Sequence, residues 1–291
     1  AIRELAEPTY QTDRPVTTDP PILTRPTRRA LWLLAASLFL ATCVLSQPAT
    51  GWNVNTRLDL VFAVVDHGEL HIDQYHEAKE TFTNDKAAYG GHVYSDKIIG
   101  LSLVAIPVYA VIRGVANLVD EEPDFQLTQF VATRLTVSLS AALAAVLMAI
   151  LMMRMGGRPR RVIVTVAGVF YGSMLFGYSS VFYPYLPGIA ACLGALLVVY
   201  SPPLTVRRAA AVGGLLGTAL LFDLTFNIAV AVIGVLFVMA LAKLPGAQRW
   251  RAVALATMAG AAPLLLFAAY STHIFGKPTI PYTYEVSEYF R

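Results

Sequence analysis

Most residues that could carry out chemistry lie in one polar segment, residues 49–128. The pattern from Thr56 to His67 predicts an amphipathic helix, on which Asp59 and Asp66 share one face. Their spacing corresponds to about 10 Å along a helix axis. That separation is too long for two acids that act on one bond, but it allows both carboxylates to line one groove.

Three other positions place charge beside apolar sequence. Asp96 and Lys97 directly precede the apolar stretch from Ile98 to Ile112, and Arg134 lies near the start of another apolar run. Arg134 either extends its guanidinium to the membrane interface or binds a phosphate there, which the forked geometry of arginine favours. Asp223 lies between two short apolar runs, and we interpret it as a turn residue, with a substrate or ion ligand as the alternative.

The histidines raise the alternative of a divalent metal site, because imidazole and carboxylate groups are good ligands for transition metals. The residues concerned are His67, His71, His76, His92 and His273, with Asp66, Glu69, Asp73 and Glu77. No compact ligand motif such as HExxH is present, and Gly68 interrupts the helix that would align the first two histidines. We therefore expect a solvated polar loop without a cofactor, and a metal site remains the alternative.

The composition predicts that membrane-spanning helices position these residues. Hydrophobic residues make up 56% of the chain and charged residues 14%, whereas soluble domains contain about 25% charged residues. Several apolar runs approach the roughly 20 residues that cross a bilayer, and runs of Ala, Leu and Val favour helices over a barrel. We predict an all-α polytopic transmembrane bundle with spans at 30–47, 130–153, 162–178, 186–200, 209–222, 226–242 and 252–271.

The distribution of charge predicts the orientation of the chain. Clusters of Lys and Arg occur at 28–29, 154–161, 207–208 and 243–251. The positive-inside rule places all of them, and the N-terminus, on the cytoplasmic side. Outside the N-terminal region, most acids lie within residues 49–128, which we expect on the opposite side.

These orientations divide the chain into a tail and a membrane domain. Residues 1–29 are predicted to be a flexible cytoplasmic tail, and residues 30–291 a membrane domain. An even number of crossings must connect two cytoplasmic clusters, so the short apolar stretch after Lys97 should not cross. We predict that residues 98–118 form an interfacial helix within the long outer loop 49–128.

The order of these features resembles the C-type glycosyltransferase superfamily, which includes protein O-mannosyltransferases and lipid A aminoarabinose transferases. DKIIGL is similar to the D/N-K-P-P-L-like segment before a juxtamembrane helix in that group, and TRLTV to the R-L-P-S-like start of the next span. The likeness covers residues 30–200 and is greatest to bacterial members with YSDKAPG-like segments. It implies transfer of a sugar from a polyprenyl phosphate to an acceptor outside the cytoplasm, with inversion at the anomeric carbon.

The resemblance also implies roles for the charged residues. The general base is expected to be Asp59, or in second place Asp85, and the alternative for Asp59 is a charge on the exposed face of an interfacial helix. The residues expected to bind the donor are Asp96, Lys97 and Arg134. The family has an essential acid where this chain has Asn53, and an amide cannot act as a base. Family members have eleven or more spans, so this chain is expected to be a fragment or a shortened relative.

Three functions follow from these features, in descending order. The first is a glycosyltransferase of a bacterial inner or plasma membrane, whose partners are a lipid-linked sugar donor and membrane lipids. The second is a non-catalytic subunit with the same fold, packed in a larger membrane protein complex. A transporter comes last, because the spans contain too few polar residues to line a pathway. Nothing in the sequence indicates nucleic-acid binding.

Overall fold

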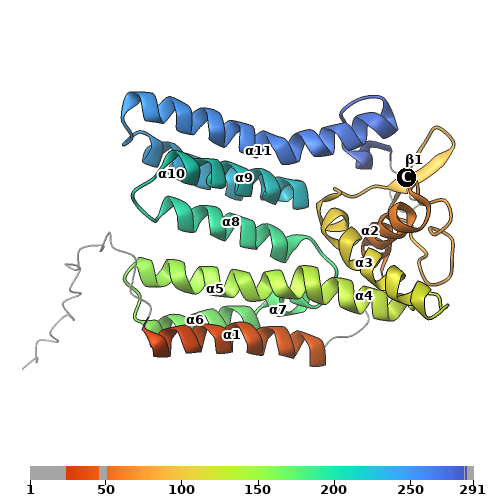
Figure 1. Ribbon diagram of the computed structural model, residues 1–291, viewed down its shortest axis with the longest axis horizontal. Helices are drawn as coiled ribbons and strands as arrows, with labels where there is room; N and C mark the ends of the chain where they lie inside the picture. The colour runs from red at the N-terminus through yellow and green to blue at the C-terminus, as the bar shows by residue number, and fades with distance from the viewer. Residues whose placement is uncertain (1–23, 46–50, 285, 287–291) are drawn as a thin grey trace, which may run out of the picture.

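Long, nearly parallel helices form most of the fold (Figure 1). The computed structural model describes residues 24–45, 51–284 and 286, and 73% of these are in helices and 3% in strands. The helices of the layer are α1 (Arg25–Val44), α5 (Leu139–Arg154), α6 (Pro159–Tyr171), α8 (Tyr185–Val199), α9 (Val206–Phe222), α10 (Asn227–Leu241) and α11 (Gly246–Phe275). α4 (Phe125–Thr133) continues into α5 through the π-helical turn Arg134–Ser138.

Five helical segments of the described chain are long and apolar enough to cross a membrane, which indicates a membrane protein. They are Arg25–Val44, Gly100–Leu118, Phe125–Arg154, Leu224–Leu241 and Gly246–Phe275. Four of the five overlap predicted spans. The predicted spans 186–200 and 209–222 correspond to the shorter helices α8 and α9.

The structure differs from the sequence prediction in the boundaries of two segments, the span 162–178 and the tail 1–29. The predicted span 162–178 is divided into α6 and the short helix α7 (Met174–Ser179), because Ser173 adopts an extended conformation and its hydroxyl accepts a hydrogen bond from the Leu175 amide. The predicted flexible tail 1–29 lies outside the described residues as far as residue 23. From Arg25 onward it is part of α1, which therefore begins earlier than predicted.

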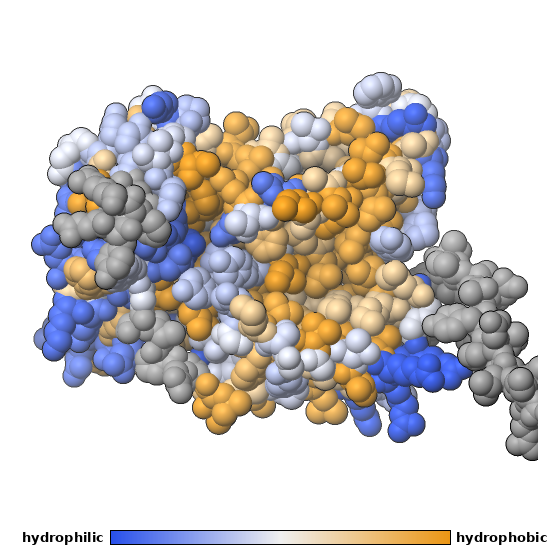
Figure 2. All heavy atoms as spheres, turned by 180° about the vertical axis from the view of Figure 1, so that it is seen from behind, coloured by the Kyte–Doolittle hydropathy of each residue, from blue (hydrophilic) through white to orange (hydrophobic). Residues whose placement is uncertain are grey.

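Polar residues gather at the two ends of the helix layer. On the face shown in Figure 2, hydrophobic residues form a broad band between hydrophilic residues at both ends. The start of α1 and the turns after α5, α8 and α10, which carry the basic clusters, lie at one end (Figure 1). The acid-rich segment lies at the other end, so the charge segregation predicted from the sequence corresponds to two ends of one structure.

The acid-rich end is formed by two helices and a hairpin. α2 (Trp52–Phe62) continues through the π-helical turn Ala63–His67, and α3 (Gly100–Leu118) packs against α2, α4 and α9. Strands β1 (Lys86–Tyr89) and β2 (His92–Ser95) pair antiparallel, which corrects the all-α prediction. Their two-residue turn is Gly90-Gly91, and both glycines have the positive φ angles that such a turn requires.

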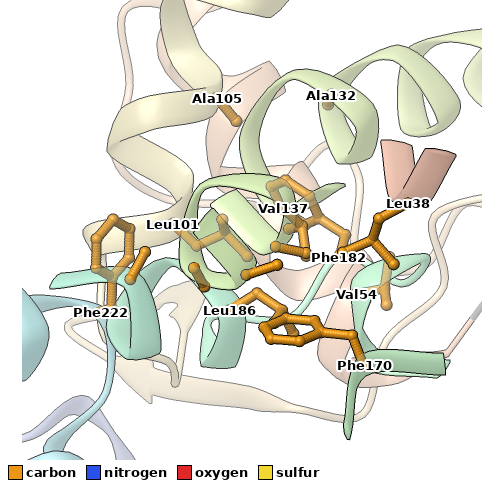
Figure 3. Close-up of a cluster of buried hydrophobic side chains, with 14 of the residues drawn as sticks. Leu38, Val54, Leu101, Ala105, Ala132, Val137, Phe170, Phe182, Leu186 and Phe222 are labelled. Carbon is orange, nitrogen blue, oxygen red and sulfur yellow. The ribbon is translucent and has the colours of Figure 1, made fainter. Parts of the chain in front are cut away.

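The largest hydrophobic core joins this end to the helix layer. Figure 3 shows side chains from α1, α2, α3, α4, α6, α8 and α9 that converge, and alanines of α5 belong to the same core. The labelled members are Leu38, Val54, Leu101, Ala105, Ala132, Val137, Phe170, Phe182, Leu186 and Phe222. Because α2 and α3 contribute to the same core as α5 and α8, the acid-rich end is packed onto the layer.

Helices α9 and α11 approach closely through small residues. A Cβ atom added to Gly213 would lie 2.0 Å from the Ala256 carbonyl oxygen, and one added to Gly217 would lie 2.2 Å from the Gly260 carbonyl oxygen. Glycines spaced four apart on one face allow two backbones to come together, as in many pairs of membrane helices. This contact holds α11 against the layer.

Replacing Gly217 with alanine should therefore destabilise the fold. The added methyl group has no space, and overpacking of this kind costs about 1–3 kcal/mol. Gly234→Ala in α10 is the matched control, since a Cβ atom at that position meets nothing within 4 Å. The control should be stabilised by about 0.5–1 kcal/mol, because alanine favours a helix. Thermal unfolding in detergent measures both effects, and a higher unfolding midpoint for Gly217→Ala would contradict the close contact.

Candidate charged site

The hairpin brings two distant carboxylates together. In the strand register Lys86 faces Ser95, so Asp85 and Asp96 flank the open end of the hairpin opposite each other. The Lys97 Nζ atom lies 2.8 Å from Asp85 Oδ2 and 2.8 Å from Asp96 Oδ2. Three of the five residues predicted from the sequence therefore form one charged group, which we call the Lys97 bridge.

The Lys97 bridge is partly accessible from one side. The Asp96 side chain is fully buried, whereas those of Asp85 and Lys97 are 15% and 16% exposed. Burial opposes the charge on Lys97, but the carboxylates of Asp96 and Asp85 overcome this effect and raise the pKa of Lys97. The Tyr282 ring centroid lies 5.9 Å from Lys97 Nζ, so an aromatic face borders the ammonium group.

Arg57 on α2 adds a second cation that the sequence analysis missed. Its Nη1 atom donates a hydrogen bond to the Ile98 carbonyl at 3.1 Å, next to Lys97. Burial lowers the pKa of Arg57, and the carboxylates of Asp223 and Asp96 oppose this change. Nothing in the sequence indicates its burial, because the neighbouring Asn55, Thr56 and Asp59 are typical of the polar face of an amphipathic helix.

Asp223 occupies the turn between α9 and the next helical segment. Its carboxylate accepts a hydrogen bond from the Thr225 amide at 2.9 Å, which confirms the interpretation as a turn residue. It also acts electrostatically on Arg57. The turn after α9 thus adds negative charge near Arg57.

Hydrogen bonds fix α2 to the segments that carry the Lys97 bridge. Thr56 Oγ1 donates to Ser95 Oγ at 3.1 Å, and Ser102 Oγ donates to the Arg57 carbonyl at 2.9 Å. At the start of α2, Thr83 Oγ1 donates to the Trp52 carbonyl, and the same hydroxyl accepts from the Asp85 amide. Both sides of the bridge are therefore positioned by the same helix.

Asp59, the first choice as general base, is buried in the interior. Its residue is 0% exposed, and neither carboxylate oxygen has a hydrogen-bond partner. Burial raises the pKa of Asp59 well above its ordinary value, since no cation compensates the charge. This placement excludes the alternative of an exposed charge, and it also keeps Asp59 out of contact with solvent.

Arg134, the fifth predicted residue, lies apart from the Lys97 bridge. It is 3% exposed and donates hydrogen bonds to Ser138 Oγ at 3.1 Å and to the Ser180 carbonyl at 3.4 Å. Its guanidinium also lies 4.6 Å from the Phe130 ring centroid. The side chain is thus held inside the helix layer and does not extend to the surface, and its Nε and Nη2 atoms have no partner.

Asp66 lies in a different environment from Asp59. Its Oδ2 atom accepts hydrogen bonds from Tyr75 at 2.9 Å and Tyr109 at 3.0 Å, and its Oδ1 atom lies 3.3 Å from Arg113 Nε. These residues line a cavity of about 350 Å³, to which Asp59 does not contribute. The groove predicted to be shared by Asp59 and Asp66 is therefore not formed.

A cluster with metal-ligating side chains lies near the other end of the hairpin. Ligand atoms of His71, Asp73 and His92 all lie within 4.8 Å of one another. His67 lies outside this cluster and contacts Tyr75. The expectation of a polar loop without a cofactor is not tested by these positions.

Burial of Asp59 should make stability depend on pH. Its ordinary pKa is 3.8, and the folded-state pKa is higher, so the folded state binds the proton more tightly than the unfolded state. Stability is then highest below the unfolded pKa and falls as the pH rises through the folded pKa. Asp59→Asn cannot ionise, so thermal unfolding from roughly pH 4 to pH 8 should show a smaller loss than wild type.

The control for this experiment is Glu121→Gln, which removes an exposed carboxylate near the end of α3. Its unfolding midpoint should follow that of the wild type at every pH. Equal slopes for Asp59→Asn and wild type would show that Asp59 has a charge-compensating partner.

No family model, curated protein or solved structure matches the chain. The function therefore has to be argued from the Lys97 bridge, Arg57 and the elements that hold them.

Proposed function

We propose that the chain is a membrane glycosyltransferase-like protein that transfers a sugar from a polyprenyl phosphate donor to an acceptor outside the cytoplasm. The observation that carries this proposal is the Lys97 bridge, a cation between two carboxylates at the acid-rich end of an apolar helix layer. Such a group combines a phosphate ligand with a base in one place. The resemblance in sequence order points to the same class of reaction.

The position of the Lys97 bridge suits a lipid phosphate. We place the helix layer across a bacterial inner or plasma membrane, with the basic turns and the N-terminus on the cytoplasmic side. Lys97 lies three residues before α3, whose exposed side chains Val104, Val111 and Val115 offer an apolar face to lipid. In this arrangement the ammonium group lies near the boundary where a phosphate head group is found, while the polyprenyl chain remains in hydrocarbon.

Exchange of partners on Lys97 would couple donor binding to base activation. In the structure Lys97 holds the carboxylate of Asp85, which is partly exposed, and that of Asp96, which is buried. An incoming donor phosphate competes with Asp85 for the ammonium group, and Asp96 retains Lys97 in place. Asp85 is then released as a free carboxylate beside the bound donor.

Burial of Asp59 moves the proposed base to Asp85, the second residue expected for this role. A base must reach the proton it removes, and Asp59 is closed off from solvent, whereas Asp85 is not. In the proposed step the acceptor hydroxyl oxygen attacks the anomeric carbon while its proton passes to Asp85. The bond from that carbon to the phosphate oxygen breaks, and Lys97 stabilises the charge left on the polyprenyl phosphate.

A non-catalytic membrane subunit is the second candidate, and one contact favours it. Asn53 Oδ1 accepts a hydrogen bond from Arg57 Nε at 3.3 Å, so a neutral amide stands beside this buried cation where the family has an acid. A chain without that acid can retain donor binding and lose transfer. The two candidates are therefore separated by measuring donor binding and sugar transfer independently.

Lys97→Met should weaken binding of a polyprenyl phosphate to the purified protein in detergent. A hydrogen bond to a charged group is worth about 1.5–3 kcal/mol, so the dissociation constant should rise about 10- to 100-fold. Lys79→Met removes an exposed lysine outside the bridge and serves as the control. Native mass spectrometry measures the bound lipid, and unchanged binding by Lys97→Met would remove Lys97 from the donor site.

Asp85→Asn should lower the rate of sugar transfer by about 100- to 10,000-fold, the usual contribution of a general base. Asp59→Asn should retain transfer, because its carboxylate does not reach solvent. The assay supplies labelled polyprenyl-phosphate sugars to membranes that contain each variant. Full transfer by Asp85→Asn would refute its role as base, and lipid binding without transfer by wild type would support the non-catalytic subunit.

A further inference from the structure

Three side chains near the turn of the hairpin converge on one point. His92 begins β2, and His71 and Asp73 lie in the turn segment that follows α2 and its π-helical extension. The Asp73 Oδ2 atom lies 2.6 Å from His92 Nδ1 and 3.2 Å from His71 Nδ1. The imidazole rings are stacked with centroids 4.4 Å apart, so both Nδ1 atoms approach the same carboxylate oxygen.

We propose that His71, Asp73 and His92 bind a divalent transition-metal ion, with zinc as the preferred ion. The ligands would be Nδ1 of each histidine and Oδ2 of Asp73. Ligand atoms in a tetrahedral zinc site lie about 2.0–2.2 Å from the metal and therefore roughly 3.3 Å from one another. Asp73 Oδ2 lies 2.6 and 3.2 Å from the two histidine nitrogens, so a small movement of the carboxylate would bring it to this spacing.

The unpaired Nδ1 atom of His71 is a second indication of a missing ligand. Its Nδ1 atom is buried and makes no hydrogen bond, although Asp73 Oδ2 lies 3.2 Å away. A buried ring nitrogen without a hydrogen-bond partner is uncommon, because burial removes its contact with water. A metal ion bound at Nδ1 would satisfy this atom.

The second ring nitrogen of His71 already has the partner that metal-binding histidines use. His71 Nε2 lies 3.3 Å from Glu69 Oε2, and Gln74 Nε2 donates a hydrogen bond to the same carboxylate at 2.6 Å. A carboxylate on the distal nitrogen fixes the tautomer in which the other nitrogen is free to bind metal. This carboxylate–histidine arrangement is the usual surrounding of a zinc-bound imidazole.

Asp73 is also held in position as a ligand by the backbone of β2. Its Oδ1 atom accepts a hydrogen bond from the Val93 amide at 2.7 Å, which leaves Oδ2 directed toward the histidines. An anionic oxygen beside two imidazoles suits zinc and neighbouring transition metals, and it suits Mg²⁺ or Ca²⁺ poorly.

The proposed ion would connect the hairpin to the turn segment and would leave a coordination position open. Three protein ligands allow zinc a fourth ligand, either water or a group from solution. The His92 side chain is 49% exposed, so the ion can enter from solvent. This proposal goes beyond the proposed transferase activity and does not depend on it, because metal binding is measured without any sugar donor.

The experiment uses the full chain in detergent after removal of metal with a chelator. Zn²⁺ is titrated in competition with a chromophoric chelator, and Co²⁺ is added separately because its absorption reports nitrogen and oxygen ligands. Wild type should bind one equivalent of either ion. Glu69→Gln should bind about 10- to 100-fold more weakly, and His92→Ala should lose more affinity because it lacks a ligand.

His273→Ala is the matched control, since this exposed histidine lies on α11, outside the cluster. It should bind zinc like the wild type. His92 is itself half-exposed, so its alanine variant should fold, and circular dichroism with an unchanged unfolding midpoint in chelator checks this. Equal zinc affinity of His92→Ala and wild type, or no binding by wild type, would overturn the proposal and leave a hydrogen-bonded His–Asp–His cluster.

Discussion

The Lys97 bridge depends on one constraint, the register of the hairpin. Asp85 and Asp96 meet because Lys86 pairs with Ser95, and that register is set by the two-residue turn Gly90-Gly91. A slip of one residue would turn every side chain of a strand to the opposite face. It would also leave Lys97 with only its neighbour Asp96 as a partner. The geometry of a short turn therefore decides whether two carboxylates share one ammonium group.

Helix α2 gives this register a rigid support. Thr83, which precedes β1, donates a hydrogen bond to the Trp52 carbonyl of α2. Ser95, at the end of β2, accepts a hydrogen bond from Thr56 of α2. The same helix buries Arg57 with several acids around it and Asp59 with no partner at all. Buried charges are stable only where partners or loss of the charge compensate desolvation. Arg57, with acids around it, shows the first solution, and Asp59, two positions along the same helix, shows the second.

The apolar runs were enough to predict the helix layer, because long stretches without charge have few other stable conformations in a chain of this composition. The hairpin was missed, although alternating residues around Gly-Gly are a recognised turn signal. The association of Asp85 with Lys97 could not be derived from spacing, since it depends on strand register. The burial of Asp59 also could not be predicted from the sequence. Its sequence context matches an amphipathic helix, but every residue of α2 from Val54 to Phe62 is buried, so the helix has no exposed face there for Asp59.

The two charged clusters of the hairpin must act separately, and strand geometry explains why. His92 begins β2 and Asp96 directly follows its end, so the strand rise of about 3.3 Å per residue places them roughly 13 Å apart. A metal ion at His92 cannot contact a phosphate held by Lys97 across that distance. The ion would affect the Lys97 bridge only through the hairpin. It would fix the His92 end of β2, whose other end is already held by the hydrogen bond between Ser95 and Thr56. Loss of the ion would then loosen the hairpin without removing any group that touches the donor.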